Sequence, residues 1–261
     1  MKKTLSLTLA LIMLLSVALT LASCGEKKEQ TIIMGFDAAY PPFTYTDSTN
    51  GSYIGFDIEY ATKVCEKLGY KLEFKAIDWD AKDAQLTSGS IDCIWSGFTY
   101  EDRENDYAWT ERYLDNTIVI LTKDANIKKV ADLAGKTVAV QSDSSGETAL
   151  KGNADLVASF KDGKFLTEAS YTTAFEKLTA GSYEAIIVDI GVAKYLQRTN
   201  TAMLIVDEPI STETYGVGFR KTDAELAKKV SDAMIEVAKD TAFIKGLCEK
   251  YGVEYDAFLL K

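Results

Sequence analysis

Apolar runs of strand length alternate with longer segments of helical periodicity along most of the chain. Strands are expected where short apolar runs stand between polar turns, at residues 31–35, 71–76, 91–96, 118–122, 137–141, 185–188 and 217–219. One helix face is marked by apolar residues at the i, i+3, i+4, i+7 spacing, namely Ala61, Val64, Cys65 and Leu68. Two long helices are expected at the end of the chain, the first capped by Asp223 and running to about residue 239, the second over 241–250. This alternation predicts an α/β fold whose strands are mainly parallel.

The amino terminus has the layout of an export signal. Lys2 and Lys3 precede an uncharged run over residues 5–22, which ends in small residues and Cys24. A short transmembrane anchor is the alternative, but the run barely reaches the roughly 20 apolar residues that a span needs and contains serines and threonines. Residues 21–24, Leu-Ala-Ser-Cys, resemble the bacterial lipobox, in which the cysteine is lipidated and the chain is cut before it. We therefore expect a signal peptide at residues 1–23, a lipid anchor on Cys24, a linker over residues 24–30 and an extracytoplasmic domain from residue 31.

Composition narrows the possible chemistry. The 261 residues include no histidine, which excludes Ser-His-Asp, Cys-His and HExxH sites. A formal net charge of −10 disfavours nucleic acid as a partner. Cys65, Cys93 and Cys248 are too widely spaced for a CxxC metal or redox motif and are expected as buried apolar residues, with a Cys65–Cys93 disulfide as the alternative. We expect no metal and no cofactor.

A short pattern occurs twice in the chain. Residues 86–95, LTSGSIDCIW, return in similar form as residues 178–187, LTAGSYEAII, and each copy has the pattern of a helix end, a glycine cap and a buried strand. Two similar α/β lobes would carry one copy each, although any helix-to-strand turn can look this way. The first strand continues into Ser96, Gly97 and Thr99 and then Arg103, whereas the second ends in Asp189. Since ligands of open α/β sheets bind beyond the carboxyl ends of strands, two facing lobes would present a cation and an anion to one cleft.

Arg103 and Asp189 are the candidate charges of this cleft. Taken alone, Arg103 stands among acidic residues and could be a solvated surface charge. Asp189 follows the apolar run 185–188, so its carboxylate is expected to be enclosed and to need a partner. A zwitterion would satisfy both residues, with its ammonium group on Asp189 and its carboxylate on the guanidinium fork of Arg103.

Aromatic residues after two strands are candidates for a ligand-binding wall. Tyr40 lies beside two prolines after the first strand, and Trp79 follows the second strand. We expect these two rings to sandwich a ligand side chain, with Asp37 contacting its polar tip. Ordinary loop packing is the alternative for all three residues.

Two segments have features of anion-binding loops. Gln141, Ser144 and Ser145 stand between a strand and a helix start, where backbone N–H groups can bind an anion, although a plain serine cap of the helix is the alternative. Residues 135–137, Gly-Lys-Thr, look like the end of a phosphate-binding loop. The leading glycine of that motif is missing and no strand precedes the segment, so we reject this interpretation.

Together these pieces resemble the extracytoplasmic solute-binding proteins of polar amino-acid ABC importers, the family that includes glutamine-, histidine- and lysine/arginine/ornithine-binding proteins. The resemblance covers nearly all of residues 31–251. It rests on motifs in a fixed order: FDAAYPPF at 36–43, GFDIE at 55–59, SGSID at 88–92, GFT at 97–99 followed by Arg103, DLAGKTVAV at 132–140 and YGVGF at 215–219. The loop between Gly97 and Arg103 is one residue shorter than in familiar members, and Gln141 replaces their usual lysine or leucine.

The resemblance implies a two-lobed, type II periplasmic-binding-protein-like α/β fold, with two crossing strands as a hinge near residues 113–117 and 211–215. Lobe 1 would comprise residues 31–117 plus 212–261, and lobe 2 residues 118–211. By position, Arg103 would hold the ligand α-carboxylate with help from the Thr99 N–H and the Ser145 backbone. Asp189 would accept the ammonium group, beside the Gly97 carbonyl and the Thr99 hydroxyl. The expected ligand-binding residues are Asp37, Tyr40, Trp79, Ser96, Gly97, Thr99, Arg103, Gln141, Ser144, Ser145 and Asp189.

The function that the resemblance implies is capture of a free polar amino acid by a monomeric, lipid-anchored protein, which passes it to a membrane permease. No enzymatic activity is expected. One alternative is a dehydratase for prephenate-like acids on the same fold, for which Glu147 and Asp80 are conceivable general acids. Another is a binding module that feeds a surface sensor. Arginine, lysine, glutamine and cystine all remain open as ligands at this point, because Asp37 with two aromatic rings suits each of them.

Overall fold

A computed structural model describes residues 30–261, so the expected signal peptide and Cys24 lie outside the described residues. The strands are β1 (Thr31–Phe36), β2 (Ala39–Tyr40), β3 (Thr44–Thr46), β4 (Tyr53–Ile54), β5 (Lys71–Ala76), β6 (Cys93–Thr99), β7 (Ala108–Trp109), β8 (Leu114–Thr122), β9 (Val138–Gln141), β10 (Leu166–Glu168), β11 (Ala185–Asp189) and β12 (Leu204–Phe219). The α-helices are α2 (Phe56–Leu68), α3 (Lys82–Thr87), α4 (Ser145–Lys151), α5 (Ala154–Ser159), α6 (Tyr171–Thr179), α7 (Ile190–Thr199), α8 (Ala224–Ala238) and α9 (Thr241–Tyr251).

The main sheet has two parallel parts joined by two antiparallel strands. Its strand order is β10-β9-β11-β8-β12-β6-β1-β5, and β7 pairs with β12 off this path. At one end β1 pairs in parallel with β5 and β6, and at the other β9 pairs in parallel with β10 and β11. In the middle, β8 and β12 run antiparallel to each other and to their outer neighbours.

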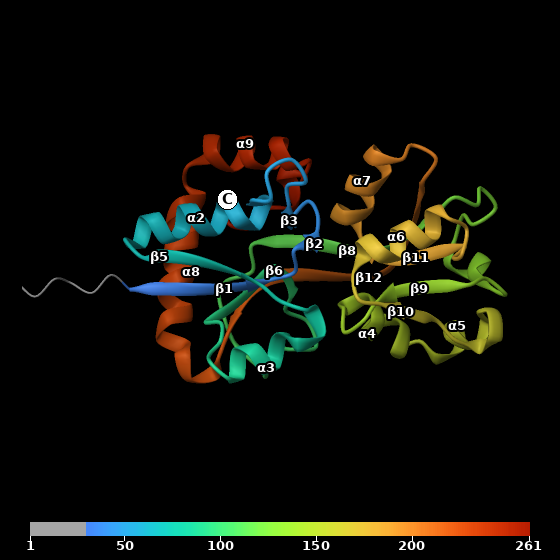
Figure 1. Cartoon of the computed structure of the whole chain (residues 1–261), viewed down its shortest axis with the longest axis horizontal. Coiled ribbons are helices and arrows are strands. Elements are labelled where there is room, and N and C mark those ends of the chain that lie inside the picture. The colour runs from blue at the N-terminus through green and yellow to red at the C-terminus, as the bar shows by residue number, and fades with distance from the viewer. Residues whose placement is uncertain (1–29) are drawn as a thin grey trace, which may run out of the picture. The chain divides into compact units, whose positions relative to one another are not determined.

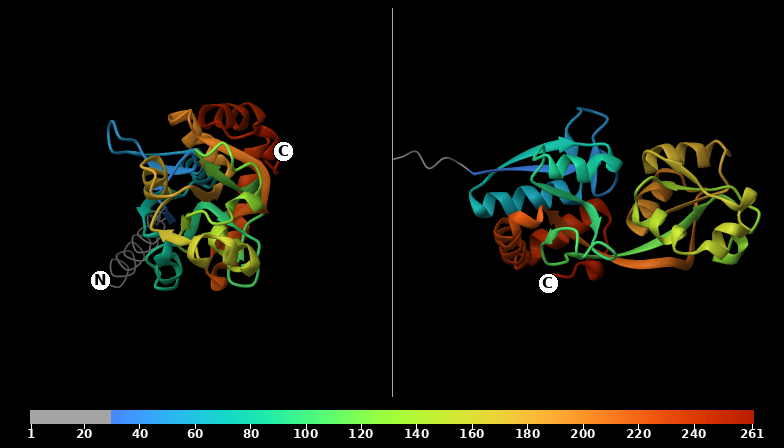
Figure 2. Two further views of the ribbon diagram at one scale, coloured as in Figure 1. Left: turned by 90° about the vertical axis from the view of Figure 1, so that its right-hand side faces the viewer. Right: turned by 90° about the horizontal axis from the view of Figure 1, so that it is seen from below.

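These two parts form two lobes (Figure 1). The first lobe carries β1 to β7 with α2, α3, α8 and α9, so it uses both ends of the described chain. The second lobe carries β9 to β11 with α4 to α7. Strands β8 and β12 lie side by side and pass from one lobe to the other, as the right-hand view of Figure 2 shows. The expectation of a two-lobed α/β fold with a two-strand connection is therefore confirmed.

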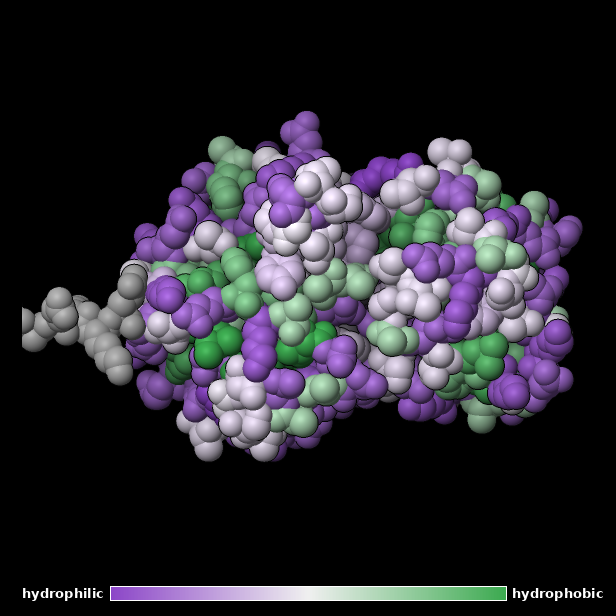
Figure 3. Space-filling view, in the orientation of Figure 1, coloured by the Kyte–Doolittle hydropathy of each residue, from purple (hydrophilic) through white to green (hydrophobic). Residues whose placement is uncertain are grey.

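The strands are stabilised by burial on both faces. All positions of β6 and of β11 are buried, as expected for parallel strands that helices cover on both sides. Cys65, Cys93 and Cys248 are free and buried, so the Cys65–Cys93 disulfide is absent. In the space-filling view, hydrophilic residues are spread over both lobes and apolar residues form scattered patches (Figure 3).

The connecting strands are longer than the sequence pattern predicts. The apolar pattern gave strands only at residues 217–219 and 118–122, whereas β12 begins at Leu204 and β8 at Leu114, so that they include the crossing segments near 211–215 and 113–117 that the family resemblance implied. Between Asp207 and Thr214 most side chains of β12 are at least partly exposed, so this segment lacks the apolar run from which strands were predicted. The register of β12 against β8 also shifts between Val206 and Ser211. A strand that crosses between lobes is half solvated, and its sequence therefore looks like a loop.

Asp223 precedes α8 as expected, but its side chain does not cap the helix. Its Oδ2 atom instead lies 2.6 Å from Arg220 Nε. Arg220 Nη2 also pairs with Asp92 at 3.0 Å, in the loop before β6. Asp223 thus holds the Arg220 side chain, which also pairs with Asp92, and does not cap the first turn of α8.

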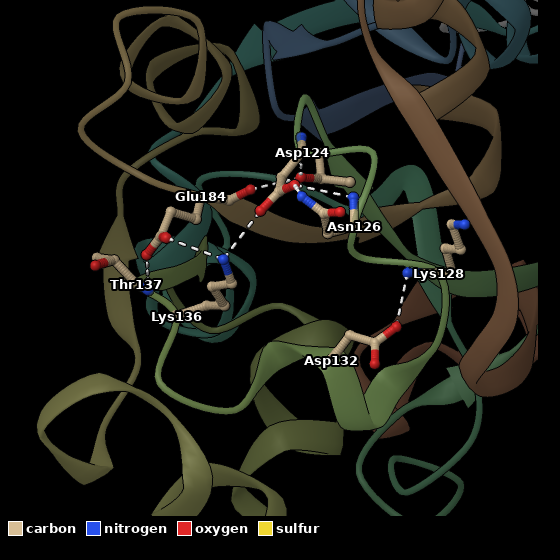
Figure 4. Close-up of polar contacts among 8 residues, drawn as sticks. Asp124, Asn126, Lys128, Asp132, Lys136, Thr137 and Glu184 are labelled. Atoms are coloured by element: carbon tan, nitrogen blue, oxygen red, sulfur yellow. Dashed lines mark hydrogen bonds and ion pairs between the residues drawn. The ribbon is translucent and has the colours of Figure 1, made fainter.

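Residues 135–137 have a structural role at the far edge of the second lobe (Figure 4). The Lys136 ammonium group lies 2.9 Å from Asp124 and 3.4 Å from Glu184, and Glu184 also accepts the Thr137 N–H at 2.8 Å. Hydrogen bonding to Asp124 raises the pKa of Lys136 above its usual value. The segment leads into β9 instead of following a strand, and its lysine is already paired, so the geometry agrees with the rejection of a phosphate loop.

Within residues 30–261, no helix combines the length and the apolar character needed to cross a bilayer.

Gly55 is predicted to be essential for stability because its backbone conformation and its surroundings both exclude a side chain. Its φ is 138°, and a Cβ atom would lie 2.1 Å from the Phe43 carbonyl oxygen. We expect Gly55→Ala to lower the free energy of unfolding by at least about 2 kcal/mol in urea titrations. Gly89, with φ 77° and no atom near the Cβ position, is the matched control, and Gly89→Ala should cost only about 1 kcal/mol. Equal losses in the two variants would contradict the assignment of a steric clash at Gly55.

Candidate ligand-binding site

The carboxyl ends of four strands meet around one cavity that contains about 280 Å³ of empty space. The lining residues come from both lobes and are Asp37, Tyr40, Trp79, Ser96, Gly97, Thr99, Arg103, Gln141, Ser144, Ser145, Tyr171 and Asp189. All eleven positions selected from the sequence are in this set, together with Tyr171, which was not selected. This 280 Å³ includes space that is open to solvent.

Strand ends place the polar residues of the site. Asp37 follows β1, Thr99 ends β6, Gln141 ends β9 and Asp189 ends β11. Each of these strands is held in the sheet by buried apolar residues, so the side chain at its carboxyl end is fixed in position. This arrangement agrees with the general location of ligands in open α/β sheets.

Arg103 presents an unpaired guanidinium group to the cavity. Its Nη1 atom donates to the Thr99 carbonyl at 3.3 Å, and its Cζ atom lies 5.1 Å from the centre of the Phe98 ring. The Trp109 indole N–H donates to the Arg103 carbonyl at 3.1 Å and fixes the loop. Across residues 30–261 the Arg103 side chain forms no ion pair, so the acids beside it in sequence do not neutralise it. Arg103 is therefore available to an anion.

Asp189 presents a buried carboxylate to the same cavity. Only 2% of the residue is exposed, and Oδ1 accepts hydrogen bonds from Asn116 Nδ2 at 2.7 Å and from the Tyr215 hydroxyl at 2.5 Å. Burial raises the pKa of Asp189 above its usual value. No lysine or arginine of the described chain pairs with it, so it can accept a cationic group from a ligand. Asn116 and Tyr215 were not selected from the sequence, because each lies in a strand that looks purely structural.

Glu213 is the main polar residue that the sequence analysis missed. It is 7% exposed, and its Oε1 atom accepts from Thr99 Oγ1 at 3.0 Å, Asn116 Nδ2 at 2.8 Å and Ser145 Oγ at 3.1 Å. The Thr99 hydroxyl, expected beside the ligand ammonium group, is therefore bonded to Glu213 instead. Glu213 lies in the half-exposed crossing segment of β12, so no apolar pattern in the sequence indicated its burial.

Asp37 and Gln141 contact each other across the cleft. Gln141 Nε2 donates to Asp37 Oδ2 at 2.7 Å and to the Ala169 carbonyl at 3.1 Å. The Ala39 N–H donates to Asp37 Oδ1 at 2.8 Å, and the Asp37 N–H donates to Ser96 Oγ at 3.2 Å. Burial raises the pKa of Asp37. Ser96 thus supports the loop that carries Asp37, and the cleft is closed over this end of the cavity.

Two of the aromatic residues form separate walls. The Tyr40 ring stacks on Phe43, with 5.3 Å between ring centres, whereas the Trp79 ring packs edge-on against Phe98 at 5.7 Å. Tyr40 and Trp79 both line the cavity, but they do not form a ring pair with each other. Tyr171, the first residue of α6, is 1% exposed, and its hydroxyl lacks a hydrogen-bond partner in the described chain. Its position in an amphipathic helix made it look like an ordinary core residue in the sequence.

Ser144 and Ser145 begin α4, and the structure gives their side chains different roles. Ser144 Oγ accepts the Glu147 N–H at 3.1 Å and donates to the Gln141 carbonyl at 2.8 Å, so its hydroxyl is a helix cap. Ser145 Oγ donates to Glu213. Gly97, on the opposite lobe, donates its N–H to the buried Asp57 Oδ2 at 2.7 Å.

Contacts at the cleft mouth join the two lobes. The Lys82 ammonium group forms an ion pair with Asp143 of the opposite lobe, and it lies 5.2 Å from the centre of the Trp79 ring. Thr172 Oγ1 donates to the Ala39 carbonyl at 3.1 Å. Among residues 30–261, no group of three or more Cys, Asp and Glu residues is arranged to hold a metal ion.

Comparisons with known proteins agree with this geometry. Residues 32–254 match the family described as bacterial extracellular solute-binding proteins, family 3. The chain is 30% identical to the L-cystine-binding protein TcyJ of Escherichia coli (strain K12), over 86% of this chain and 84% of that protein. It is also 30% identical to the L-cystine-binding protein TcyA of Bacillus subtilis (strain 168), over 94% and 96% of the two chains.

A solved structure is similar over most of its length. It is an ABC uptake transporter substrate-binding protein from Streptococcus pneumoniae with bound histidine, with a TM-score of 0.82 and 30% identity, and the match covers 87% of this chain and 94% of that one. The family consists of solute-binding proteins rather than enzymes. From its sequence, its two-lobed fold and these relatives, this chain belongs to the bacterial extracellular solute-binding proteins of family 3.

Proposed function

We propose that the protein captures a free polar amino acid between its two lobes and delivers it to the permease of an ABC importer. The observation that carries this proposal is the pair of opposite charges in one cavity, the unpaired Arg103 guanidinium and the buried Asp189 carboxylate. A free amino acid has one carboxylate and one ammonium group a few bonds apart. It therefore complements both residues, whereas a simple anion would leave the buried Asp189 without a partner and a simple cation would leave Arg103 without one.

In this proposal each end of the ligand has its own subsite. Arg103, with the backbone of Thr99 and Ser145, holds the α-carboxylate, and Asp189 accepts the ammonium group. Tyr40 and Trp79 enclose the side chain from two directions. Asp37 and Gln141 lie at the far end and set which polar side chain fits. Tyr171 adds a buried hydroxyl group that lines the cavity near Asp189 and Ser144.

Closure follows from the distribution of these residues over the two lobes. Arg103 and Trp79 belong to the first lobe and Asp189 to the second. The chain passes from the first lobe to the second near residue 117 and returns near residue 212. An amino acid held on the first lobe would reach Asp189 only when the lobes close. Its higher affinity for the closed state then shifts the population toward closure.

The dehydratase alternative is not favoured. Neither Glu147 nor Asp80 is among the residues that line the cavity, and Glu147 pairs with Lys151 at 3.0 Å. We therefore propose that the protein has no catalytic role. For its placement we propose a monomer outside the cytoplasm, exported by residues 1–23 and anchored through a lipid on Cys24. Such an anchor would raise the local concentration of the protein near the permease.

A thermal-shift screen tests the binding role directly. The purified protein, freed of carried-over ligand by refolding, is heated with each common amino acid, cystine and ornithine. A ligand at a hundredfold excess over its Kd should stabilise the folded protein by about 2.7 kcal/mol. We expect a selective rise, and L-cystine and L-histidine are the first to test because relatives that bind them share 30% of their residues with this chain. Folded protein that responds to no amino acid would overturn the proposal.

Removal of the guanidinium group should reduce affinity strongly. We expect Arg103→Ala to cost about 2–5 kcal/mol of binding free energy in titration calorimetry, because a ligand carboxylate would remain enclosed without its partner. Arg112→Ala is the matched control, since Arg112 is exposed over the Tyr100 ring and does not line the cavity. Near-normal affinity in Arg103→Ala would contradict the assignment of Arg103 as the partner of the ligand carboxylate.

The Lys82–Asp143 ion pair should slow ligand release. We expect Lys82→Met to weaken amino-acid binding about two- to fivefold, mainly through faster dissociation, because the pair exists only between closed lobes and Asp143 is half exposed. Stopped-flow tryptophan fluorescence measures the rate, with Lys63→Met as the control, since Lys63 pairs with Glu66 on one helix face. An unchanged dissociation rate in Lys82→Met would show that this pair does not contribute to closure.

A further inference from the structure

Glu213 connects both lobes and both connecting strands through a single carboxyl group. Its Oε1 atom accepts hydrogen bonds from Thr99 of the first lobe, Ser145 of the second lobe and Asn116 of β8, while Glu213 itself belongs to β12. Thr99 and Ser145 are the residues proposed to support Arg103 at the ligand carboxylate. Because Thr99 belongs to the first lobe and Ser145 to the second, one carboxyl oxygen can accept from both only when the lobes are closed, so this cluster is complete only in the closed protein.

Glu213 is paired with the other buried acid through one amide group. Asn116 Nδ2 donates to Asp189 Oδ1 at 2.7 Å and to Glu213 Oε1 at 2.8 Å. Two carboxylates this close, both buried, disfavour ionisation of both. Burial, and next the charge of Asp189, raise the pKa of Glu213 to about 8. Asp189 accepts from the Tyr215 hydroxyl at 2.5 Å, and the neighbouring hydroxyls of Tyr40 and Tyr171 also lower its pKa, which favours Asp189 as the ionised member.

The charged groups around Glu213 lead to the same assignment. From the loop after β6, Arg103, Glu101 and Asp102 line a second cavity together with Glu213, and Glu101 is bonded to the Thr214 N–H and hydroxyl at 2.7 Å each. From the end of β11 the facing group is Asp189, and the tyrosines beside it, Tyr40, Tyr171 and Tyr215, have pKa values raised by burial and stay neutral.

The other elements packed against β12 add no cation at Glu213. The acid and the base on α4, Glu147 and Lys151, pair with each other, and Asp115 on β8 is exposed. Arg103 is thus the one cation of the described chain that shares a cavity with Glu213. Asp189 balances Arg103, and a zwitterionic ligand adds no net charge, so a second carboxylate at position 213 would be uncompensated.

We propose that Glu213 is a positioning residue that acts as the neutral acid in the closed, ligand-bound protein, orienting Thr99 and Ser145 at the ligand carboxylate, so that closure takes up a proton. The inference rests on the proposed amino-acid function. The proton resides on Oε2, because Oε1 already accepts from three donors. When the lobes open, Glu213 can no longer bond both Thr99 and Ser145 and is exposed to water, so its ionised form is restored and the proton is released.

The sign of the pH dependence follows from this linkage. The closed state holds a proton that the open state releases near the ordinary pKa of glutamate, so amino-acid affinity is highest in acid and falls as pH rises. The fall is steepest between the two pKa values, up to about tenfold per pH unit, and levels off above the value of about 8 for the closed state.

Titration calorimetry in buffers of different ionisation enthalpy counts the protons taken up. The probe is whichever of L-cystine, L-arginine and L-glutamine gives the largest thermal shift, since none of them titrates near pH 6.5. We expect the full chain to take up more than half a proton per amino acid at pH 6.5, and Glu213→Gln to take up almost none. Glu101→Gln, which changes an acid of the same second cavity, should keep the uptake of the unmodified protein.

Affinity distinguishes positioning from a passive structural role. Glutamine preserves the acceptor and the neutral charge without taking up a proton, so Glu213→Gln should bind at least about tenfold more tightly than the unmodified protein at pH 6 and show a flat affinity profile from pH 6 to 8. Glu213→Ala should bind at least about tenfold more weakly than Glu213→Gln at pH 6. Circular dichroism melting checks that both variants fold, and if neither folds, the proton count of the unmodified protein still decides.

Two results would overturn the inference while leaving the proposed function intact. One is amino-acid binding by the unmodified protein with no proton uptake at pH 6.5. The other is uptake that persists unchanged in folded Glu213→Gln. Failure of all three amino acids to bind the unmodified protein would instead count against the proposed function, and the inference about Glu213 would fall with it.

Discussion

Asp189 is a carboxylate that is almost fully enclosed and that has no cation bonded to it within residues 30–261. Moving an ion of this kind out of water costs several kcal/mol even after the protein relaxes. Hydrogen bonds from Asn116 and Tyr215 offset part of that cost, and both donors belong to the strands that connect the lobes. The stability of the Asp189 carboxylate therefore depends on the strand arrangement. Strands β8 and β12 must run side by side for these two donors to meet at the end of β11.

The closed arrangement depends on a small number of contacts between lobes. They are polar pairs, Gln141 with Asp37 and Lys82 with Asp143, together with ring contacts such as Tyr40 with Tyr171. One cluster of buried apolar residues extends through both lobes, and the rings of Tyr40, Phe43 and Tyr171 belong to it where the lobes meet. A bound amino acid that contacts both lobes adds to these contacts only in the closed state, which shifts the population toward closure.

The sequence analysis found the cavity residues that stand at the ends of buried strands. It missed the polar residues that lie in the two crossing strands. Asp37, Thr99, Gln141 and Asp189 each follow a buried apolar run, so the position of the run gave the position of the polar residue. Asn116 and Glu213 lie in β8 and β12 where these strands leave one lobe for the other. There the chain is half solvated and does not show the alternation of an ordinary strand. These two residues are buried where both lobes meet the crossing strands, with Glu213 bonded to Thr99 and Ser145 and Asn116 bonded to Asp189.

The sequence by itself determined the α/β class and the approximate ranges of the core strands through its apolar periodicity, and the motifs that carry the family resemblance indicated the two lobes and the eleven positions that line the cavity. Only the tertiary structure decided which hydroxyl bonds which acid, that the Arg103 guanidinium stays unpaired, and that Asp189 and Glu213 share one amide. These features join residues far apart in the sequence, and the bonds from Thr99 and Ser145 to Glu213 join two lobes. The energies that hold them depend on burial created by closure, which no local pattern along the chain contains.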